Sequence, residues 1–341
     1  MLSRLDRLAY HSQHLSFLIN ATVMEEAARL VTRNKRGHLD HAVMRALQHR
    51  RSELHRRDLE NVDAGLYPRD LLFDIPMRRY LRELPRLIAD APRVVRRMRS
   101  NDYKDIPHVD KERFPAYYRR TFHWQTDGYF SDHSAEVYEL GVELLFRGTA
   151  DVMRRQIIPP VTEYVRAAAG QDASHVKLLD IACGTGRTLH QLARTHPTMR
   201  LHGVDLSPAY IKRARKRLAD VEELTLAVEN AEALPWADAT FDIVTSVYLF
   251  HELPRNARRN VVREMLRVVK PGGLVVIEDS AQPSESPDLA AVLHGFPREF
   301  HEPFYEDYLG DDLGALLEAA GFRDVLTRQA LVAKVVVGRR P

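Results

Sequence analysis

From about residue 172 to the C-terminus, short runs rich in β-branched residues alternate with segments of helical spacing. Runs such as VKLLDI (176–181) and FDIVTSVY (241–248) have the length and composition of buried strands. Strands separated by single helices form a parallel, doubly wound sheet with right-handed crossovers. The last two runs, RDVLTRQ (323–329) and LVAKVVVG (331–338), follow each other without a helix. We therefore expect an α/β fold with a mostly parallel, seven-stranded sheet and one antiparallel strand in a terminal hairpin.

The first 120 residues show another pattern, in which helical stretches are interrupted by proline and glycine. This part is basic: it contains 25 lysines and arginines against 16 aspartates and glutamates, whereas the remainder carries 25 against 31. Such a bias indicates an acidic partner, a membrane surface or solvated helical faces. We predict a mainly helical, basic domain over residues 1–125, which shapes a substrate pocket or mediates oligomerisation, and a second domain over 126–341.

The segment YLRELPRLIADAPRVVRRMRS (80–100) places leucine, isoleucine, valine and methionine on one helical stripe with arginines around it. Pro85 and Pro92 should kink or interrupt this helix. We expect the stripe to pack inside the helical domain, and the alternative is a peripheral contact with an anionic membrane surface. Apolar stripes of this kind would also suit a homodimer.

Several classes of protein are not expected from this chain. Its most apolar run, GLVVIE (273–278), is far shorter than the roughly 18 apolar residues of a membrane-spanning helix. The N-terminal stretch has no continuous apolar region and no small-residue cleavage pattern, so we expect no secretory signal. Cys183 is the single cysteine, which excludes an intrachain disulfide and a CxxC metal site. We therefore expect a cytoplasmic protein.

The stretch LLDIACGTGRTLHQLA (178–193) runs from a predicted strand through a glycine-rich turn into a predicted helix. Gly184 and Gly186 allow a tight turn and a close approach of the backbone to a ligand at the N-terminus of the helix. Asp205 follows at the end of the next strand, where a carboxylate can accept hydrogen bonds from both hydroxyls of a ribose. These features alone would suit a nicotinamide dinucleotide equally well.

Three details favour a different nucleoside ligand. Leu189 replaces the third glycine of the GxGxxG pattern, which in dinucleotide sites packs helix against strand beneath a pyrophosphate. Asp180, at the end of the first strand, suits an ammonium group and would repel a pyrophosphate. Asn230, Ala231 and Glu232, after the third strand, offer an amide oxygen and a backbone N–H to an adenine edge. A ligand with a ribose, an adenine and a zwitterionic amino-acid tail satisfies all three details.

At residues 135–341 the chain resembles the class I S-adenosylmethionine-dependent methyltransferases, in particular their ubiquinone/menaquinone C-methyltransferase-like branch (methyltransferase type 11). The resemblance rests on DIACGTG (180–186), Asp205, ALPWADATFDIVTSVYLFHEL (233–253) and RVVKPGGLVVIED (267–279), in order and at the family's spacing. It implies a Rossmann-like methyltransferase fold, S-adenosylmethionine as methyl donor and S-adenosylhomocysteine as product. Asn230 departs from the family, which usually has aspartate there. The predicted donor-binding residues are Tyr138, Asp180, Ala182, Gly184, Thr185, Gly186, Asp205, Leu206, Asn230, Ala231 and Tyr248.

A methyl acceptor must be held in line with the donor's methyl group, and a protonated acceptor must also lose a proton. His251 follows the fourth predicted strand, where the crevice of a doubly wound sheet opens, and an imidazole there suits a general base. The alternative role of His251 is a hydrogen bond to local backbone. The aromatic stretch FPREFHEPFYEDYLGDDL (296–313) lies in the family's usual position of an acceptor-covering insertion. The predicted acceptor-pocket residues are Trp124, His301, Phe304, Tyr305 and Tyr308.

The stretch FHWQTDGYFSDHS (122–134) gathers two histidines, two acidic residues and four aromatic residues around one glycine. Its histidines and acids lack the short spacing of a dedicated zinc site, so we expect no metal. Gly128 offers a hinge, and Trp124 and Tyr129 offer apolar cover, which favours a lid over donor and acceptor. The alternative is a packed interdomain corner. The candidate catalytic residues are His251, Tyr129 and His123.

The sequence therefore predicts methyl transfer from S-adenosylmethionine to a carbon or oxygen, less readily a sulfur or nitrogen, of a small apolar or amphipathic acceptor. The alternatives are a protein that binds the donor without methyl transfer, a nicotinamide oxidoreductase and a nucleic-acid methyltransferase. Nucleic acid is not the expected partner, because the chain lacks the Asn/Asp-Pro-Pro-aromatic motif of base-flipping amino methyltransferases and a recognisable RNA-binding module.

Overall fold

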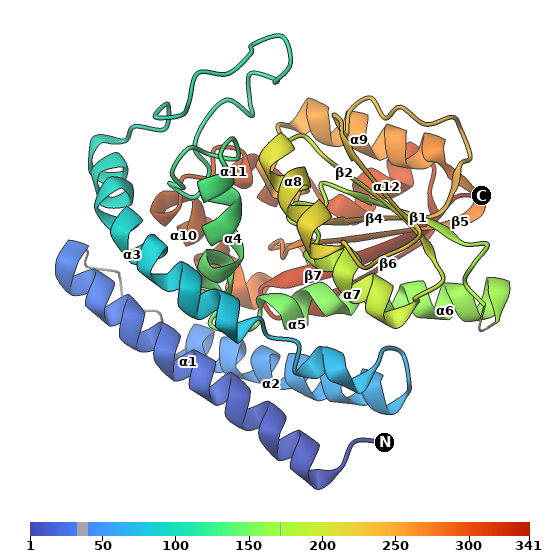
Figure 1. Cartoon of the computed structure of the whole chain (residues 1–341), viewed down its shortest axis with the longest axis horizontal. Coiled ribbons are helices and arrows are strands. Elements are labelled where there is room, and N and C mark those ends of the chain that lie inside the picture. Colours follow the sequence, from blue (N-terminus) through green and yellow to red (C-terminus); the bar gives the residue numbers. More distant parts are fainter. Residues whose placement is uncertain (33–39, 171) are drawn as a thin grey trace.

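The structure is a computed structural model that describes residues 1–32, 40–170 and 172–341. Within these residues seven strands form one sheet in the order β3-β2-β1-β4-β5-β7-β6 (Figure 1). β7 pairs antiparallel with both of its neighbours, whereas β1 to β5 pair in parallel. The expected doubly wound sheet with a terminal hairpin is confirmed. The strands are β1 (Lys177–Ile181), β2 (Arg200–Asp205), β3 (Leu224–Val228), β4 (Phe241–Val247), β5 (Val269–Ser280), β6 (Arg323–Ala330) and β7 (Ala333–Arg339).

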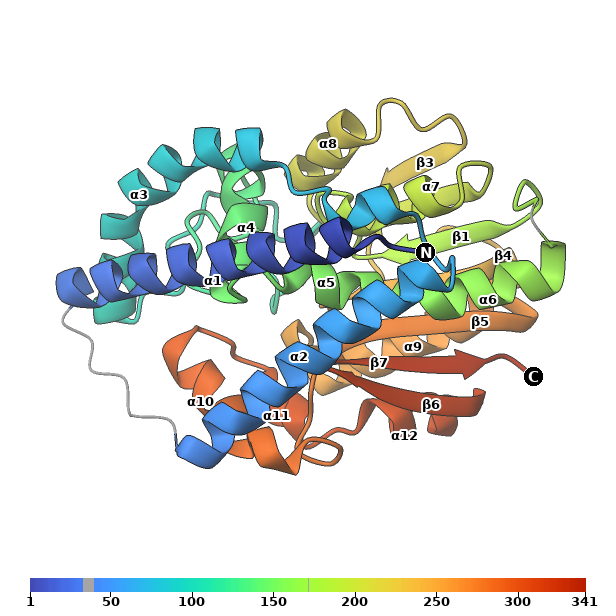
Figure 2. The ribbon, with the colours of Figure 1, turned by 90° about the horizontal axis from the view of Figure 1, so that it is seen from below.

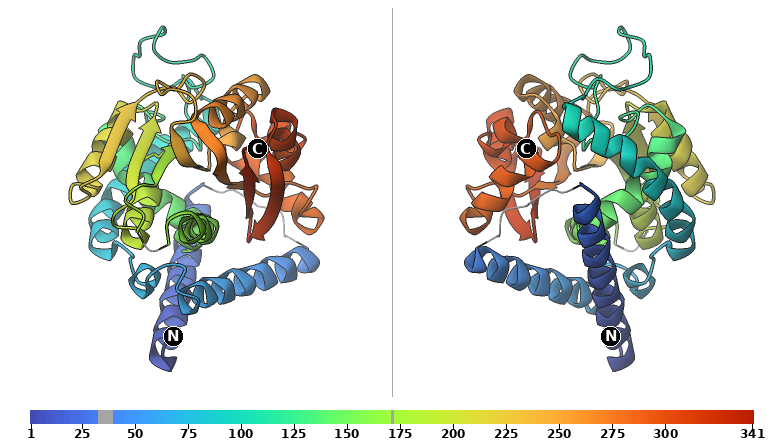
Figure 3. Two further views of the ribbon diagram at one scale, coloured as in Figure 1. Left: turned by 90° about the vertical axis from the view of Figure 1, so that its right-hand side faces the viewer. Right: turned by 90° about the vertical axis from the view of Figure 1, so that its left-hand side faces the viewer.

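Helices cover both faces of this sheet (Figures 1 and 3). Successive residues of a strand point to opposite faces, and Leu178 and Leu179 of β1 accordingly belong to two different buried clusters. The cluster of Leu178 includes side chains of α6 (Ile158–Ala169), α7 (Arg187–Thr195) and α8 (Pro208–Arg217). The cluster of Leu179 includes side chains of α9 (Arg255–Val268), α10 (Ala290–Glu299), α11 (Tyr305–Leu309) and α12 (Leu313–Ala320).

The strand order reverses at β1, which pairs with β2 on one side and with β4 on the other. Because the carboxyl ends of parallel strands meet at one edge of a sheet, the loops that follow these three strands open a crevice there. Asp180 lies opposite Gly203 of β2 and Thr245 of β4, one residue before β1 ends. The fold therefore brings the glycine-rich loop, Asp205 and the segment of His251 to the same edge.

Three long helices precede the sheet: α1 (Arg4–Thr32), α2 (His41–Asp63) and α3 (Met77–Ser100). Figure 2 shows α1 and α2 along one side of the molecule and α3 beside α4 (Asp132–Leu145). Tyr10 of α1 and Leu59 of α2 share a buried cluster with Leu178 of β1. None of the helices in the described residues has the length and apolar content that a membrane crossing demands. The predicted domain boundary at residue 125 stays a prediction, and residues 33–39 within that segment lie outside the described residues.

α3 differs from the sequence-based expectation in two respects. The helix continues without interruption through Pro85 and Pro92. Its apolar stripe is only partly buried: Leu81 and Ile88 are 65% and 60% exposed, whereas the other five apolar residues of the stripe are half-buried. The expectation that the stripe packs inside the protein therefore holds only in part. The most deeply buried face of the helix is mainly charged, and each of its charged side chains has an ion-pair or hydrogen-bond partner; its residues are Tyr80, Glu83, Asp90 and Arg97.

A buried ion pair joins α2 to Arg155, which follows α5 (Ala150–Arg154). Asp58 of α2 is 0% exposed and accepts hydrogen bonds from the Tyr10 hydroxyl (2.7 Å), the Tyr67 hydroxyl (2.5 Å) and Arg155 Nε (3.0 Å). Burial alone would raise the pKa of Asp58, but the charge of Arg155 and these hydrogen bonds lower it. The carboxylate therefore stays ionised in the interior and compensates the buried guanidinium.

We expect Asp58→Ala to lower the free energy of unfolding by about 3–5 kcal/mol, because the change leaves the Arg155 guanidinium buried without a counter-charge. Urea unfolding followed by circular dichroism measures this loss. Glu53→Ala is the matched control on the same helix, since the pair of Glu53 with Arg56 lies at the surface, and its midpoint should equal that of the wild type. Equal midpoints for Asp58→Ala and wild type would contradict a stabilising role of the buried pair.

Candidate functional site

The glycine-rich loop between β1 and α7 turns tightly into the helix. Gly186, the residue before α7, has a φ of 79°. A Cβ at this position would lie 3.1 Å from the Cβ of Ala214 and 3.0 Å from Leu218 Cδ1, both of which belong to the region of α8. Only glycine accepts this backbone conformation without strain in so narrow a space. The loop is therefore fixed in a shape that leaves the backbone N–H of Gly184 directed at Asp205.

Asp205, at the end of β2, is held by two backbone donors. Gly184 N donates to Oδ2 (2.9 Å) and Ser207 N donates to Oδ1 (2.8 Å). Burial raises the pKa of Asp205 to about 6, although both hydrogen bonds oppose the rise. Each carboxylate oxygen has a second lone pair, so the side chain can still accept hydrogen bonds from a ligand.

Asp180 is a buried carboxylate with an unused oxygen. Its Oδ1 accepts a hydrogen bond from the Thr245 hydroxyl (2.7 Å), whereas Oδ2 has no hydrogen-bond partner among the described residues. Burial raises the pKa of Asp180 to about 7. An unpaired buried carboxylate oxygen is costly unless a ligand satisfies it. The site therefore fits a donor whose tail carries an ammonium group.

One open cavity of about 750 Å3, its mouth included, lies over the carboxyl ends of β1, β2 and β4. Tyr138, on α4, also lines it and has its ring 5.4 Å from that of Tyr210. The residues that the sequence predicted and that line this cavity are Tyr129, Tyr138, Ala182, Gly184, Asp205, Leu206, Asn230, Ala231 and Tyr248. Five other predicted residues do not line it, namely Asp180, Thr185, Gly186, His123 and His251.

Asn230 lies in this cavity wall with its side-chain oxygen already engaged. Oδ1 accepts a hydrogen bond from the backbone N–H of Glu232 (2.9 Å). The carboxylate of Glu232 in turn accepts from the Tyr117 hydroxyl (2.7 Å). The turn of Asn230 is thus fixed by local hydrogen bonds, and its predicted contact with an adenine amino group would use the second lone pair of the same oxygen.

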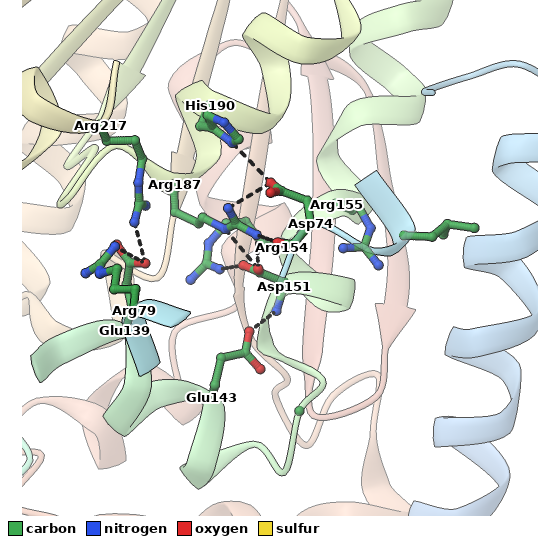
Figure 4. A network of polar contacts seen from close by, with 12 residues as sticks. Asp74, Arg79, Glu139, Glu143, Asp151, Arg154, Arg155, Arg187, His190 and Arg217 are labelled. Atoms are coloured by element: carbon green, nitrogen blue, oxygen red, sulfur yellow. Dashed lines mark hydrogen bonds and ion pairs between the residues drawn. The ribbon is translucent and has the colours of Figure 1, made fainter. Parts of the chain in front are cut away.

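The donor loop is tied to the N-terminal part of the chain by buried ion pairs, shown in Figure 4. Arg187, the first residue of α7, donates from Nε to Asp151 of α5 (2.9 Å) and from Nη1 to Asp74 (2.9 Å). Thr185 donates its hydroxyl hydrogen to Glu139 of α4. Burial alone would raise the pKa of Asp151, but the charge of Arg187 holds it well below its usual range. Three anionic side chains from preceding elements therefore fix the start of α7.

His251 lies in a short 3-10 turn, Phe250–Glu252, directly after β4. Its Nδ1 is 2.7 Å from Asp279 Oδ1 at the end of β5. Burial alone would lower the pKa of His251, but the charge and hydrogen bond of Asp279 raise it to about 9. The Asp279 carboxylate therefore favours the protonated form of the imidazole and opposes its use as a general base.

The stretch 122–134 is a tightly packed corner in this structure, with Tyr129 presented to the cavity. Gly128 has a φ of 54°, and a Cβ there would lie 2.6 Å from the Arg120 carbonyl oxygen. Arg97 of α3 donates from Nη2 to the carbonyl oxygen of Trp124 (3.1 Å). The Tyr129 hydroxyl donates to Glu252 Oε1 (2.5 Å). The packed corner is observed, while the closing motion of a lid stays a prediction.

The five predicted acceptor-pocket residues do not appear among the residues that line the cavity. Tyr305 and Tyr308 belong to the buried cluster beneath α11, and Trp124 donates its indole N–H to the Glu299 carbonyl oxygen (3.2 Å). The ring of His301 stacks on Tyr103 at 5.0 Å. Phe304 packs edge-on against Tyr117, which does line the cavity. Of these five residues Phe304 is the one that packs against the cavity wall through Tyr117, and contact of all five with an acceptor stays a prediction.

Several cavity-lining residues were not singled out from the sequence, among them Tyr117, Tyr118 and Glu252. Tyr117 and Tyr118 lie in an irregular segment between α3 and α4, where no periodicity marks them. Glu252 also lines the cavity, and its position directly after His251 is the signal that could have identified it. Its carboxylate is 3.3 Å from His123 Nε2, so that both candidate catalytic histidines lie near the same acid.

Comparison with known proteins identifies the family. The family described as "Methyltransferase domain" matches residues 178–273. The demethylmenaquinone methyltransferase of Thermotoga maritima is 32% identical over 54% of this chain and 74% of its own length. The ubiquinone/menaquinone biosynthesis C-methyltransferase UbiE of Desulfotalea psychrophila is 33% identical over 57% of this chain and 87% of its own length.

A fungal relative is named for methyl transfer to oxygen instead of carbon. O-methyltransferase resE of Aspergillus sclerotiorum is 28% identical over 58% of this chain and 67% of its own length, so the chain spans about two thirds of that protein. The matched family segment contains β1, the glycine-rich loop and Asp205, which are the elements that form the cavity floor. With S-adenosylmethionine as its methyl donor, the chain belongs to the class I methyltransferases, in the branch that includes the ubiquinone/menaquinone C-methyltransferases.

Proposed function

We propose that this methyltransferase acts on a small, largely apolar acceptor that carries a hydroxyl group, and that it methylates the oxygen or a carbon activated by that hydroxyl. The observation that carries the proposal is the tyrosine-rich cavity wall, in which Tyr117, Tyr118 and Tyr129 lie together with the acidic side chain of Glu252. Aromatic walls with few polar groups favour flat apolar ligands. The relatives' names, one a C-methyltransferase and one an O-methyltransferase, support both target atoms.

S-adenosylmethionine supplies a methyl group on a sulfonium, which is already activated for displacement. We assign Asp205 to the ribose hydroxyls and Asp180 Oδ2 to the ammonium group of the donor's tail. The remaining work of the chain is to align the acceptor, to exclude water and to take up a proton where the acceptor carries one. The cluster of Tyr129, Glu252 and His123 at the cavity wall is the group that we assign to holding the acceptor hydroxyl.

We expect Asp205→Ala to abolish measurable binding of S-adenosylhomocysteine, because it removes the carboxylate that faces the ribose and the anchor of Gly184 N–H. Calorimetric titration measures the affinity. Asp220→Ala is the matched control, since Asp220 lies in the exposed turn after α8. Wild-type affinity in Asp205→Ala would contradict the assigned donor site, and loss of binding in Asp220→Ala would show that the assay reports folding instead.

We expect the affinity for S-adenosylhomocysteine to rise from about pH 5 to about pH 8, because both assigned carboxylates bind the ligand in their ionised form. Burial raises the pKa of Asp205 to about 6 and that of Asp180 to about 7, so protonation weakens binding as the pH falls through these values. Calorimetry across this range measures the slope. In the Asp180→Asn variant the increase in affinity near pH 7 should disappear. An affinity profile equal to that of the wild type would contradict the assignment of Asp180 to the donor site.

Formation of S-adenosylhomocysteine with a panel of quinols, catechols, phenols, amines and thiols tests the acceptor class. We expect turnover with one of the hydroxylated aromatic compounds, and turnover confined to the amines or thiols would contradict the proposal. With the best acceptor, Tyr129→Phe should lower kcat by about 100-fold, because the hydrogen bond that fixes Glu252 is lost.

Two measurements make the Tyr129→Phe result specific. Affinity for S-adenosylhomocysteine should stay close to that of the wild type, which separates acceptor alignment from donor binding. Tyr164→Phe is the matched control, because Tyr164 lies on α6 against Arg339, away from the cavity. Unchanged turnover in a folded Tyr129→Phe variant would remove both the assigned role and the lid hypothesis.

A further inference from the structure

Three segments that are distant in the sequence converge beside the cavity. His123 comes from the corner at 122–134, His251 and Glu252 from the turn after β4, and Glu302 from the connection between α10 and α11. One potential ligand atom from each of these four side chains lies within 4.8 Å of the other three. His123 Nδ1 is 2.7 Å from Glu302 Oε1, and its Nε2 is 3.3 Å from Glu252 Oε1.

The cluster has more negative than positive charge. Glu252 and Glu302 pair with His123, and Asp279 pairs with His251, so that three carboxylates face two imidazoles. In the described part of the chain no lysine or arginine forms an ion pair with any of the three acids. Even with both imidazoles protonated, the group keeps a net charge of −1. Such an excess of buried negative charge is unfavourable unless a cation compensates it.

Glu302 is the member with the least compensation. Its side chain is 4% exposed, and neither carboxylate oxygen accepts a hydrogen bond from any described residue. The contact with His123 Nδ1 is short but lacks the alignment of a hydrogen bond, because that nitrogen also has no hydrogen-bond partner among the described residues. A buried carboxylate without a hydrogen-bond donor, beside two histidines, is unfavourable unless a ligand or a cation satisfies it.

Asp279 orients His251 in the way that metal ligands are oriented. It lies 2.7 Å from Nδ1 and also accepts hydrogen bonds from the backbone N–H groups of Phe250 (2.7 Å) and Ser280 (2.8 Å). The pairing occupies Nδ1, so that Nε2 is the nitrogen that His251 can offer to an ion. A carboxylate behind the histidine is the usual outer partner of a histidine that binds zinc.

We propose that His123, His251, Glu252 and Glu302 bind a divalent transition metal ion of the zinc type. Two imidazoles and two carboxylates suit zinc and its neighbours better than calcium or magnesium, which prefer all-oxygen sites. Bonds of about 2.0–2.2 Å would require only a small contraction of the cluster. Because Glu252 also lines the cavity, the ion would lie at the acceptor wall. The binding of the ion does not depend on the proposed acceptor.

The competing arrangement is a proton on His123, shared between Glu252 and Glu302 without any metal. This arrangement uses the same four side chains and predicts no specific affinity for a metal ion. Direct titration therefore distinguishes the two arrangements, and it needs neither donor nor acceptor.

The full chain, stripped with a chelator and dialysed, is titrated with Zn2+ by calorimetry and, separately, with Co2+ under visible absorption. We expect one equivalent of Zn2+ per chain and a Co2+ spectrum of a four- or five-coordinate site. His123→Ala and the nearly isosteric Glu302→Gln should each weaken Zn2+ binding by at least about 10-fold. The matched control is His133→Ala, which removes the other histidine of the same corner and should leave the affinity unchanged.

Three results would overturn the proposal: no stoichiometric Zn2+ binding, a Co2+ spectrum of the hexaaqua type, or equal affinities in wild type, His123→Ala and Glu302→Gln, which would indicate an adventitious ion only. Circular dichroism of the variants confirms their fold, and the Co2+ spectrum of the wild type tests the site even where a variant fails to fold. Failure here would leave donor binding and acceptor turnover untouched.

Discussion

The ion pairs of Arg187 are the constraint on which the donor site depends. Arg187 is the first residue of α7 and is buried, which places a cation at the positive end of a helix dipole. That position is unfavourable unless anions surround the guanidinium, and Asp151 and Asp74 supply them. Without both acids the buried guanidinium would have no counter-charge. The start of α7, and with it the glycine-rich loop, therefore keeps its place only while the preceding elements are docked.

This dependence explains why the N-terminal helices share a core with the sheet. The loop is held from a second direction by Glu139 of α4, which accepts from Thr185 and from Arg217 of α8 (2.6 Å). Tyr10 and Leu59, from α1 and α2, pack in the same cluster as the first strand. Through these contacts the part of the chain before the sheet supports the donor loop and the cavity. The helices before the sheet therefore contribute to the framework of the site.

The strands, the hairpin and the donor loop could be predicted because their signals are local. β-branched runs, the spacing of the glycines and the acids at strand ends all lie within a few residues of the feature that they specify. The buried face of α3 could not be predicted, because Glu83, Asp90 and Arg97 are stabilised inside by partners that are distant in the sequence. For the same reason the cavity wall of Tyr117 and Tyr118 and the position of Glu302 required the folded chain.

The corner at 122–134 concentrates features that a fold optimised for stability alone would avoid. His123, Trp124 and Asp127 all have positive φ angles, in the region that residues other than glycine seldom adopt. Backbone conformations of this kind cost free energy and persist where the surrounding structure enforces them, often at functional sites. Here they place His123 beside Glu252 and the buried Glu302 and bring Tyr129 to the cavity. Backbone strain and an excess of negative charge therefore occur at the same wall of the cavity. Both features lower the stability of the fold, and such locally unfavourable features are expected at functional sites.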